Sequence, residues 1–142
     1  MNRRRLLIAA IALLPAACAG FQPAPPNPRR TAVEQLFSRL RQDMRNDRWE
    51  RIEWVFSPDY RQAPSVRNRW EDRWTHARTM ELELVPGRIL ESGGLLNVQV
   101  RWNRVTRERN GQFLRTSGTA EVILETVGSE IRIRQILGAS FL

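Results

Sequence analysis

The stretch Leu96–Asn103, LNVQVRWN, decides the fold class because its apolar and polar residues alternate strictly. A period of two is typical of a β-strand with one face on a core and the other in water. Thr79–Val85 (TMELELV) and Gly118–Glu125 show the same alternation, and a further segment begins at Ile131. The turn signals between these segments are Ser92-Gly93-Gly94, Asn110-Gly111 and Gly128-Ser129. The sequence therefore predicts a sheet of four antiparallel strands.

Two irregularities are expected within these strands. Pro86-Gly87 bends the first strand, which the following segment RILE continues. In the last strand the apolar register shifts from Ile131 and Ile133 to Ile136, which indicates a β-bulge.

Helical patterns precede the strands. The apolar stripe of the first helix is Val33, Leu36, Phe37, Leu40 and Met44. Thr31 and Glu34 match a capping box, so we expect this helix to begin at Thr31. A second short helix is predicted from an Asn46-Asp47 cap to Ser57-Pro58, and a third from Ser65 to about His76. Three helices followed by four strands predict an α+β domain, with the helices packed on one face of a curved antiparallel sheet.

This order of elements resembles the nuclear transport factor 2-like superfamily, which has a cone-shaped, cystatin-like α+β fold. The resemblance is carried by VEQLFSRLRQDMRNDRWERIEWVFSPDY (33–60) and by EIRIRQILG (130–138), and it covers residues 31–142. Ile131 stands where the superfamily often has tryptophan. Members include isomerases, dehydratases, non-catalytic binders and assembly modules, so the resemblance implies a fold and no single activity.

The N-terminus has the features of an export signal. Arg3–Arg5 precede the apolar run Leu6–Leu14, which is shorter than the roughly 20 residues that a membrane-spanning helix needs. Ala16-Ala17 before Cys18 resemble the lipobox of bacterial lipoproteins, although Pro15 replaces the usual leucine. The resemblance implies acylation of Cys18, the only cysteine, and cleavage before it. An ordinary cleaved signal that leaves a free thiol stays the alternative.

These segments give the expected domain organisation. Residues 1–17 are the lipoprotein signal peptide, residues 18–30 the acylated cysteine and a proline-rich tether, and residues 31–142 the folded domain. Because Ala19 and not aspartate follows the cysteine, the resemblance implies the periplasmic face of the outer membrane. A secreted lipoprotein rarely meets nucleic acid, so we expect no nucleic-acid partner despite a net charge of +8.

The predicted inward face of the sheet contains no ionisable side chain. Its residues are Met80, Leu82, Leu84, Leu96, Val98, Val100, Trp102, Gly118, Ala120, Val122, Leu124, Ile131 and Ile133. General acid–base catalysis needs a titratable group inside the cone, so this face argues against an enzyme. One cysteine and one histidine cannot form a zinc site, and we expect neither a metal nor a cofactor.

The residues that could line a pocket are Phe56, Tyr60, Trp70, Trp74, His76 and Trp102. Gly118 and Ala120 would leave room opposite these rings, but the same rings could equally fill that space as core. Arginines expected on the outer face are Arg101, Arg107, Arg109, Arg132 and Arg134. They could face acidic lipid headgroups, or they could pair with Glu121 and Glu125 across the strands.

The sequence thus favours a membrane-anchored, non-enzymatic module that binds an envelope protein or an apolar small molecule. The alternatives are an isomerase- or hydrolase-type enzyme that uses Tyr60, Asp59 or His76, and a subunit of an envelope assembly complex.

Overall fold

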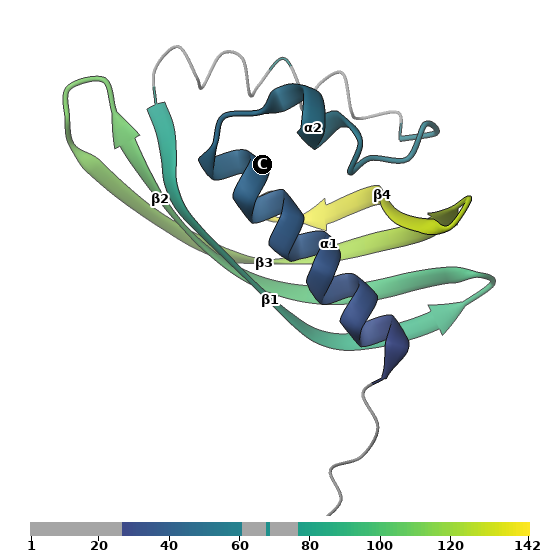
Figure 1. Cartoon of the computed structure of the whole chain (residues 1–142). Coiled ribbons are helices and arrows are strands. Elements are labelled where there is room, and N and C mark those ends of the chain that lie inside the picture. Colours follow the sequence, from purple (N-terminus) through teal and green to yellow (C-terminus); the bar gives the residue numbers. More distant parts are fainter. Residues whose placement is uncertain (1–26, 61–67, 69–76) are drawn as a thin grey trace, which may run out of the picture.

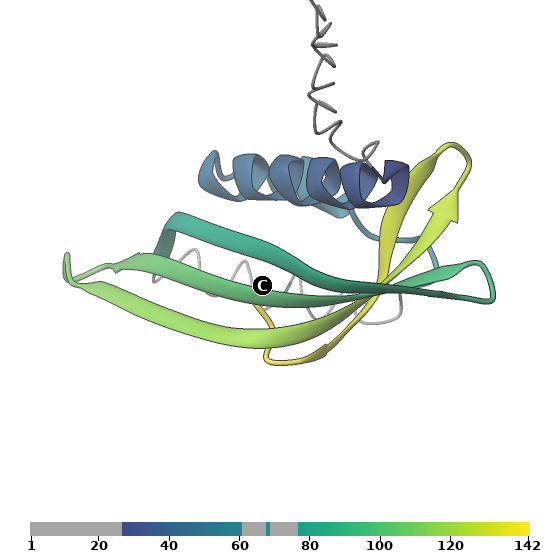
Figure 2. The ribbon, with the colours of Figure 1, turned by 90° about the horizontal axis from the view of Figure 1, so that it is seen from below.

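The alternating segments form one curved antiparallel sheet in the computed structural model, which describes residues 27–60, 68 and 77–142 (Figure 1). The strands are β1 (Ala77–Ser92), β2 (Leu95–Glu108), β3 (Phe113–Val127) and β4 (Glu130–Gly138). The described helices are α1 (Pro28–Arg45) and α2 (Trp49–Glu53). The spatial order β1-β2-β3-β4 follows the chain, and α1 lies across the concave face as a second layer (Figure 2).

The alternation in β2 is confirmed by burial. Leu96, Val98, Val100 and Trp102 are buried on the concave face, whereas Gln99 and Arg101 between them are exposed. The hairpin turns fall at the predicted positions. At Gly111 (φ 85°) and Gly128 (φ 64°) the chain takes the left-handed conformation that favours glycine.

The two predicted strand irregularities are also confirmed. Ile123 pairs with Gln135 and Leu124 pairs with Ile133, so Arg134 is the extra residue of a bulge in β4. β1 changes register between Pro86 and Ile89 and continues to Ser92.

A further bulge at Met80 makes one inward assignment wrong. Thr79 pairs with Thr106 and Glu81 with Val105, which leaves Met80 without a partner in β2. An extra residue moves the side chains before it to the opposite face. Thr79 is therefore buried, and Met80 is 37% exposed.

α1 begins earlier than the sequence pattern suggested. Its N-cap is Asn27, whose side chain accepts a hydrogen bond from the Arg29 amide at 3.0 Å, and Pro28 is its first residue. Asparagine is a strong N-cap and proline suits the first helical position, so this pair outcompetes Thr31. The prediction of Thr31 as N-cap is wrong, and residues 28–30 of the expected tether belong to the helix.

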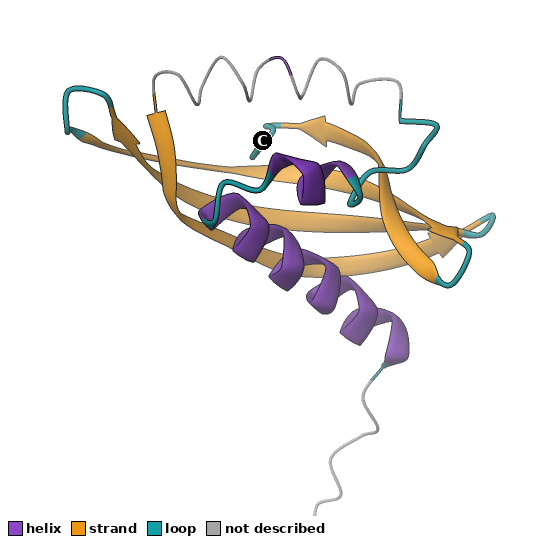
Figure 3. Cartoon of the chain, turned by 45° about the horizontal axis from the view of Figure 1, so that its top comes forward, coloured by secondary structure: helices purple, strands orange, loops and turns teal. Residues whose placement is uncertain are grey.

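α2 ends at Glu53, before the predicted Ser57-Pro58. The Ile133 amide donates to the Val55 carbonyl at 2.7 Å, and the Ser57 amide donates to the Ile133 carbonyl at 2.8 Å. This pairing beside β4 takes residues 55–57 out of the helix (Figure 3). The N-cap of α2 is Arg48 without a side-chain bond, so the predicted Asn46-Asp47 cap is wrong. The predicted third helix lies outside the described residues.

The core lies between α1 and the concave face. All five residues of the predicted apolar stripe of α1 are buried there, and each such side chain stabilises the fold by about 1.5–3 kcal/mol relative to its exposed state. Phe141 and Leu142, which follow β4, are also buried in this core. Neither described helix combines the length and the apolar character that a bilayer crossing requires.

Candidate functional site

The concave face of β2 continues beyond Trp102 with Arg104 and Thr106, which are both buried. The expectation that no inward residue ionises is therefore wrong. Alternate residues of a strand face the same side, so the inward pattern that ends in Trp102 continues to Arg104 and Thr106. The sequence therefore did contain the signal for a buried arginine.

Arg104 is held inside the cone by its neighbours. Its Nη1 donates to the carbonyl oxygen of Phe141 at 3.2 Å, and its guanidinium carbon lies 5.8 Å from the ring centroid of Trp102. An arginine stays protonated in proteins, so it can hold an anion or a carbonyl group but cannot exchange protons with a substrate. Arg104 therefore supplies binding chemistry and not acid–base chemistry.

Trp102 fills the space that Gly118 leaves. A Cβ at Gly118 would lie 2.8 Å from Cζ2 of the Trp102 ring, so the indole rests directly on the backbone of β3. Its Nε1 donates to the carbonyl oxygen of Ala139 at 2.9 Å. Trp102 and Ala120 are both buried in the core cluster. The room predicted opposite the aromatic rings is occupied, at this position, by one of those rings.

Trp102 and Arg104 together fix the segment Ala139–Leu142 against the concave face. They donate to the carbonyl groups of Ala139 and Phe141, and the Phe141 and Leu142 side chains are almost completely buried. The part of the concave face around Trp102 and Arg104 is thus covered by the chain's own side chains.

The remaining pocket candidates fall into two groups. The rings of Phe56 and Tyr60 are buried and stacked, with centroids 5.0 Å apart and an interplanar angle of 7°. Asp59 is exposed, so it does not share the buried surroundings of Tyr60. Trp70, Trp74 and His76 lie outside the described residues, as does Cys18, and their roles stay predictions.

A polar cluster that the sequence did not reveal joins the end of the α2 region to the sheet. The buried Ser57 hydroxyl donates to Glu125, and Arg134 donates to the other oxygen of that carboxylate at 2.9 Å. The bulge in β4 places Arg134 for this contact. Because the Glu125 carboxylate binds both Ser57 and Arg134, the cluster fastens residues 55–57 to the sheet.

Asp43 on α1 is buried, and its ion-pair partner lies on α2. Arg39 and Asp43 have the i, i+4 spacing of a solvated helical pair, but Nη1 of Arg51 lies 3.9 Å from the Asp43 carboxylate. Arg39 instead reaches Glu130, with an N···O distance of 3.7 Å. No group of described residues has the composition of a metal site.

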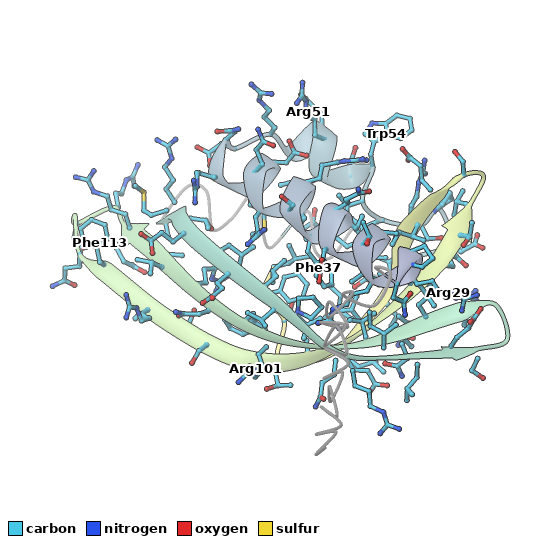
Figure 4. The ribbon with its side chains drawn as sticks, turned by 60° about the horizontal axis from the view of Figure 1, so that its bottom comes forward. Arg29, Phe37, Arg51, Trp54, Arg101 and Phe113 are labelled. Carbon is cyan, nitrogen blue, oxygen red and sulfur yellow. The ribbon has the colours of Figure 1, made fainter. Side chains whose placement is uncertain are left out.

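The arginines predicted on the outer face differ in whether they form ion pairs: those on β4 do, and those on β2 and its turn do not, within the described residues. On β4, Arg134 pairs with Glu125, and Arg132 lies 3.8 Å from Glu130 with its guanidinium over the Trp54 ring. Arg101, Arg107 and Arg109 are exposed, and none of them forms an ion pair within the described part of the chain. The pairing with Glu121 that the sequence also allowed is not formed within the described residues, where that carboxylate accepts a hydrogen bond from Asn97. Figure 4 shows Arg101 on the convex side of the sheet and Phe37 between α1 and the sheet.

Comparisons with known proteins identify the fold. No protein-family model matches the sequence, and a search of curated proteins finds no relative. Among solved structures, a conserved protein from Planctomyces limnophilus aligns with a TM-score of 0.69 and 11% identity, over 77% of this chain and 93% of that one. A protein of unknown function with a cystatin-like fold from Nostoc punctiforme aligns with a TM-score of 0.56 and 9% identity, over 75% and 86%.

The domain has a cystatin-like α+β fold. The same fold occurs in the beta subunit of a putative aromatic-ring-hydroxylating dioxygenase from Novosphingobium aromaticivorans, with a TM-score of 0.56 and 11% identity, over 76% of this chain and 86% of that subunit. At such identities the comparison defines the architecture alone, because one fold serves unrelated functions. The function of this cystatin-like domain has to be argued from its own surface and interior.

Proposed function

We propose that this chain is a lipid-anchored protein of the bacterial cell envelope whose cystatin-like domain is a non-enzymatic interaction module. The anchor is the acylated Cys18, and the compartment is the periplasmic face of the outer membrane. Two or more acyl chains on one cysteine give stable attachment, whereas a single chain gives only marginal binding. The support for the anchor is the Arg3–Arg5, Leu6–Leu14 and Ala16-Ala17-Cys18 pattern.

One observation supports the non-enzymatic part of this proposal: the part of the concave face around Trp102 and Arg104 is filled by the chain's own residues. Phe141 and Leu142 cover it, and Arg104, its ionisable group among the described residues, is directed to a backbone carbonyl. A general acid or base must reach its substrate and must change its protonation state at working pH. Arginine does not meet the second condition.

The same observation ranks an outer surface above an apolar cavity as the binding site. A small molecule at this part of the cone would displace Ala139–Leu142 and break the hydrogen bonds from Trp102 and Arg104. It would also expose Phe141, at a cost of about 1.5–3 kcal/mol. Binding through the outer surface needs none of these changes.

The anchor is tested by feeding radiolabelled palmitate to cells that express the full chain. We expect label in the wild-type protein and none in Cys18→Ser, because serine provides no thiol for the acyl transfer. Ala24→Ser, a serine placed in the tether, is the matched control and should be labelled like the wild type. A Cys18→Ser protein that still incorporates palmitate would contradict the anchor.

Native mass spectrometry of the untagged chain, released from its own envelope, tests the binding role. The interaction module predicts a co-purifying envelope component of lipid or protein nature. A stoichiometric apolar small molecule would favour the alternative ligand-binding role, and a bare monomer would contradict both.

A further inference from the structure

We infer that the tip of the β2–β3 hairpin, Val105–Arg115, is a docking surface for an anionic lipid bilayer. We call this segment the hairpin tip. The inference goes beyond the proposed anchor because it gives the folded domain a membrane contact of its own.

The hairpin tip carries two exposed apolar side chains. Phe113 is 66% exposed and Leu114 is 50% exposed. They are consecutive in β3 and so point to opposite faces, Phe113 beside Arg107 and Leu114 beside Thr106. The tip extends beyond α1 at one end of the sheet (Figure 1). An apolar group on each face lets the tip enter an interface end-on.

Arginines surround these apolar groups. Arg107 pairs directly opposite Phe113, Arg115 follows it by two residues on the same face, and Arg109 adjoins the turn. All three are exposed, and none forms an ion pair in the described structure. Glu108 is the single acidic residue of the tip, so three positive charges stand against one negative charge.

Neighbouring charges do not neutralise the hairpin tip. Arg78 on β1 lies opposite Arg107 and is engaged by Asp47, with an N···O distance of 3.0 Å. Glu81 lies opposite Val105 and forms no ion pair within the described residues. The arginines therefore remain available to an external anion.

The polar groups of the turn are already paired with one another. The Glu108 amide donates to the Gln112 carbonyl at 2.8 Å, and the Gly111 amide donates to the Glu108 carbonyl at 2.9 Å. The Asn110 and Gln112 side chains also bond to each other, and Asn110 accepts from the Gln112 amide. Unpaired polar groups are the main cost of entering a low-dielectric interface, and here that cost is reduced.

An anionic bilayer fits this surface better than a folded protein does. A stable protein interface buries about 1,200 Å² or more in total, which two side chains and a tight turn supply only in part. A bilayer accepts a small apolar tip, and an anionic leaflet attracts each nearby arginine. Arg29, at the start of α1, and Phe113 lie at opposite ends of the domain (Figure 4). The tether and the hairpin tip would thus contact a membrane at two separate points.

Vesicle co-sedimentation tests the inference in the full chain with Cys18→Ser, so that an acyl anchor does not contribute. The probes are vesicles of phosphatidylcholine alone and vesicles of equal parts phosphatidylcholine and phosphatidylglycerol. We expect tighter binding to the anionic vesicles, weakened by sodium chloride because salt screens the charges. Arg107→Gln with Arg115→Gln should reduce partitioning into anionic vesicles roughly tenfold or more. Phe113→Ser with Leu114→Ser should reduce partitioning into anionic vesicles severalfold, both at low and at high sodium chloride.

Matched variants make the test specific to the hairpin tip. Arg41→Gln with Arg45→Gln removes the same charge from α1, where neither arginine has an ion-pair partner in the described structure. Val85→Ser with Leu90→Ser removes two exposed apolar side chains from β1. Both control pairs should bind anionic vesicles like their parent. Equal losses in the tip and control pairs, or no preference for anionic vesicles, would overturn the inference, whatever palmitate labelling shows for Cys18.

Discussion

At the scale of single residues, the contact between Gly118 and Trp102 is the tightest constraint on the concave face. A methyl group at Gly118 would lie 2.8 Å and 2.9 Å from two ring carbons of Trp102, and 2.9 Å from Cβ of Ala139. The ring is fixed by its hydrogen bond to Ala139, so it cannot move aside freely. Gly118→Ala should therefore lower the free energy of unfolding by about 1–3 kcal/mol, measured by urea denaturation.

Gly87→Ala is the matched control for this prediction. Its Cβ would meet the Gln99 carbonyl oxygen at 3.4 Å, which is ordinary van der Waals contact. We expect its unfolding free energy to stay within about 0.5 kcal/mol of the parent. If Gly118→Ala is no more destabilising than Gly87→Ala, Trp102 does not occupy the position described here.

The sequence predicted which side of the strand Trp102 would face and that small residues would lie opposite the aromatic rings, but not which ring would fill that space. Alternation gives the face of each residue, whereas the partner depends on the register between strands, which the alternation does not contain. Arg104 shows the reverse case. The alternation of β2 places Arg104 inward, although the run of apolar inward residues ends at Trp102.

At the scale of elements, the start of α1 is tested by two polar substitutions. Asn27→Ala removes the acceptor of the Arg29 amide and should cost about 1 kcal/mol of unfolding free energy. Thr31→Ala lies within the helix, where its hydroxyl makes only a 3.3 Å contact with the Asn27 carbonyl. It should change the unfolding free energy by less than about 0.5 kcal/mol. The opposite ranking would restore Thr31 as the N-cap.

The bulge at Met80 gives a second test at this scale. Met80→Ala should be nearly neutral, within about 0.5 kcal/mol, because the side chain is partly in water. Leu82→Ala should cost about 2–5 kcal/mol, because Leu82 belongs to the core cluster. Thermal or urea unfolding of the two variants measures both. Equal losses would mean that β1 has no bulge here and that Met80 faces inward, as strict alternation implies.

The features that could be predicted from the sequence are those determined by residues close to them in the chain. The glycine turns, the apolar stripe of α1 and the bulge in β4 all depend on neighbouring residues, and all were predicted. The end of α2 depends on Ile133, which forms backbone hydrogen bonds with Val55 and Ser57 although it lies about 75 residues away in the sequence. The local helical pattern cannot reveal this distant backbone pairing.

At the scale of the whole molecule, the open question that the sequence left was whether the cone is a pocket or a core. Nothing in the alternation of β4 indicated that the chain would turn back after Gly138 and place Phe141 over the concave face. The Ser140 hydroxyl accepts from the Leu142 amide at 3.3 Å and helps to form this return. Of the two alternatives that the sequence left open, a filled core is therefore the one found around Trp102 and Phe141.

The closure of the cone is tested by removing the ring of Phe141. Phe141 is fully buried, so Phe141→Ala should lower the unfolding free energy by about 3–5 kcal/mol. Leu137→Ala, on the exposed side of β4, is the control and should cost less than about 1 kcal/mol. If both variants unfold at similar urea concentrations, the segment after Gly138 does not close the cone. In that event the interior would be open to an apolar ligand, and the hairpin tip would no longer be the preferred binding surface of the domain.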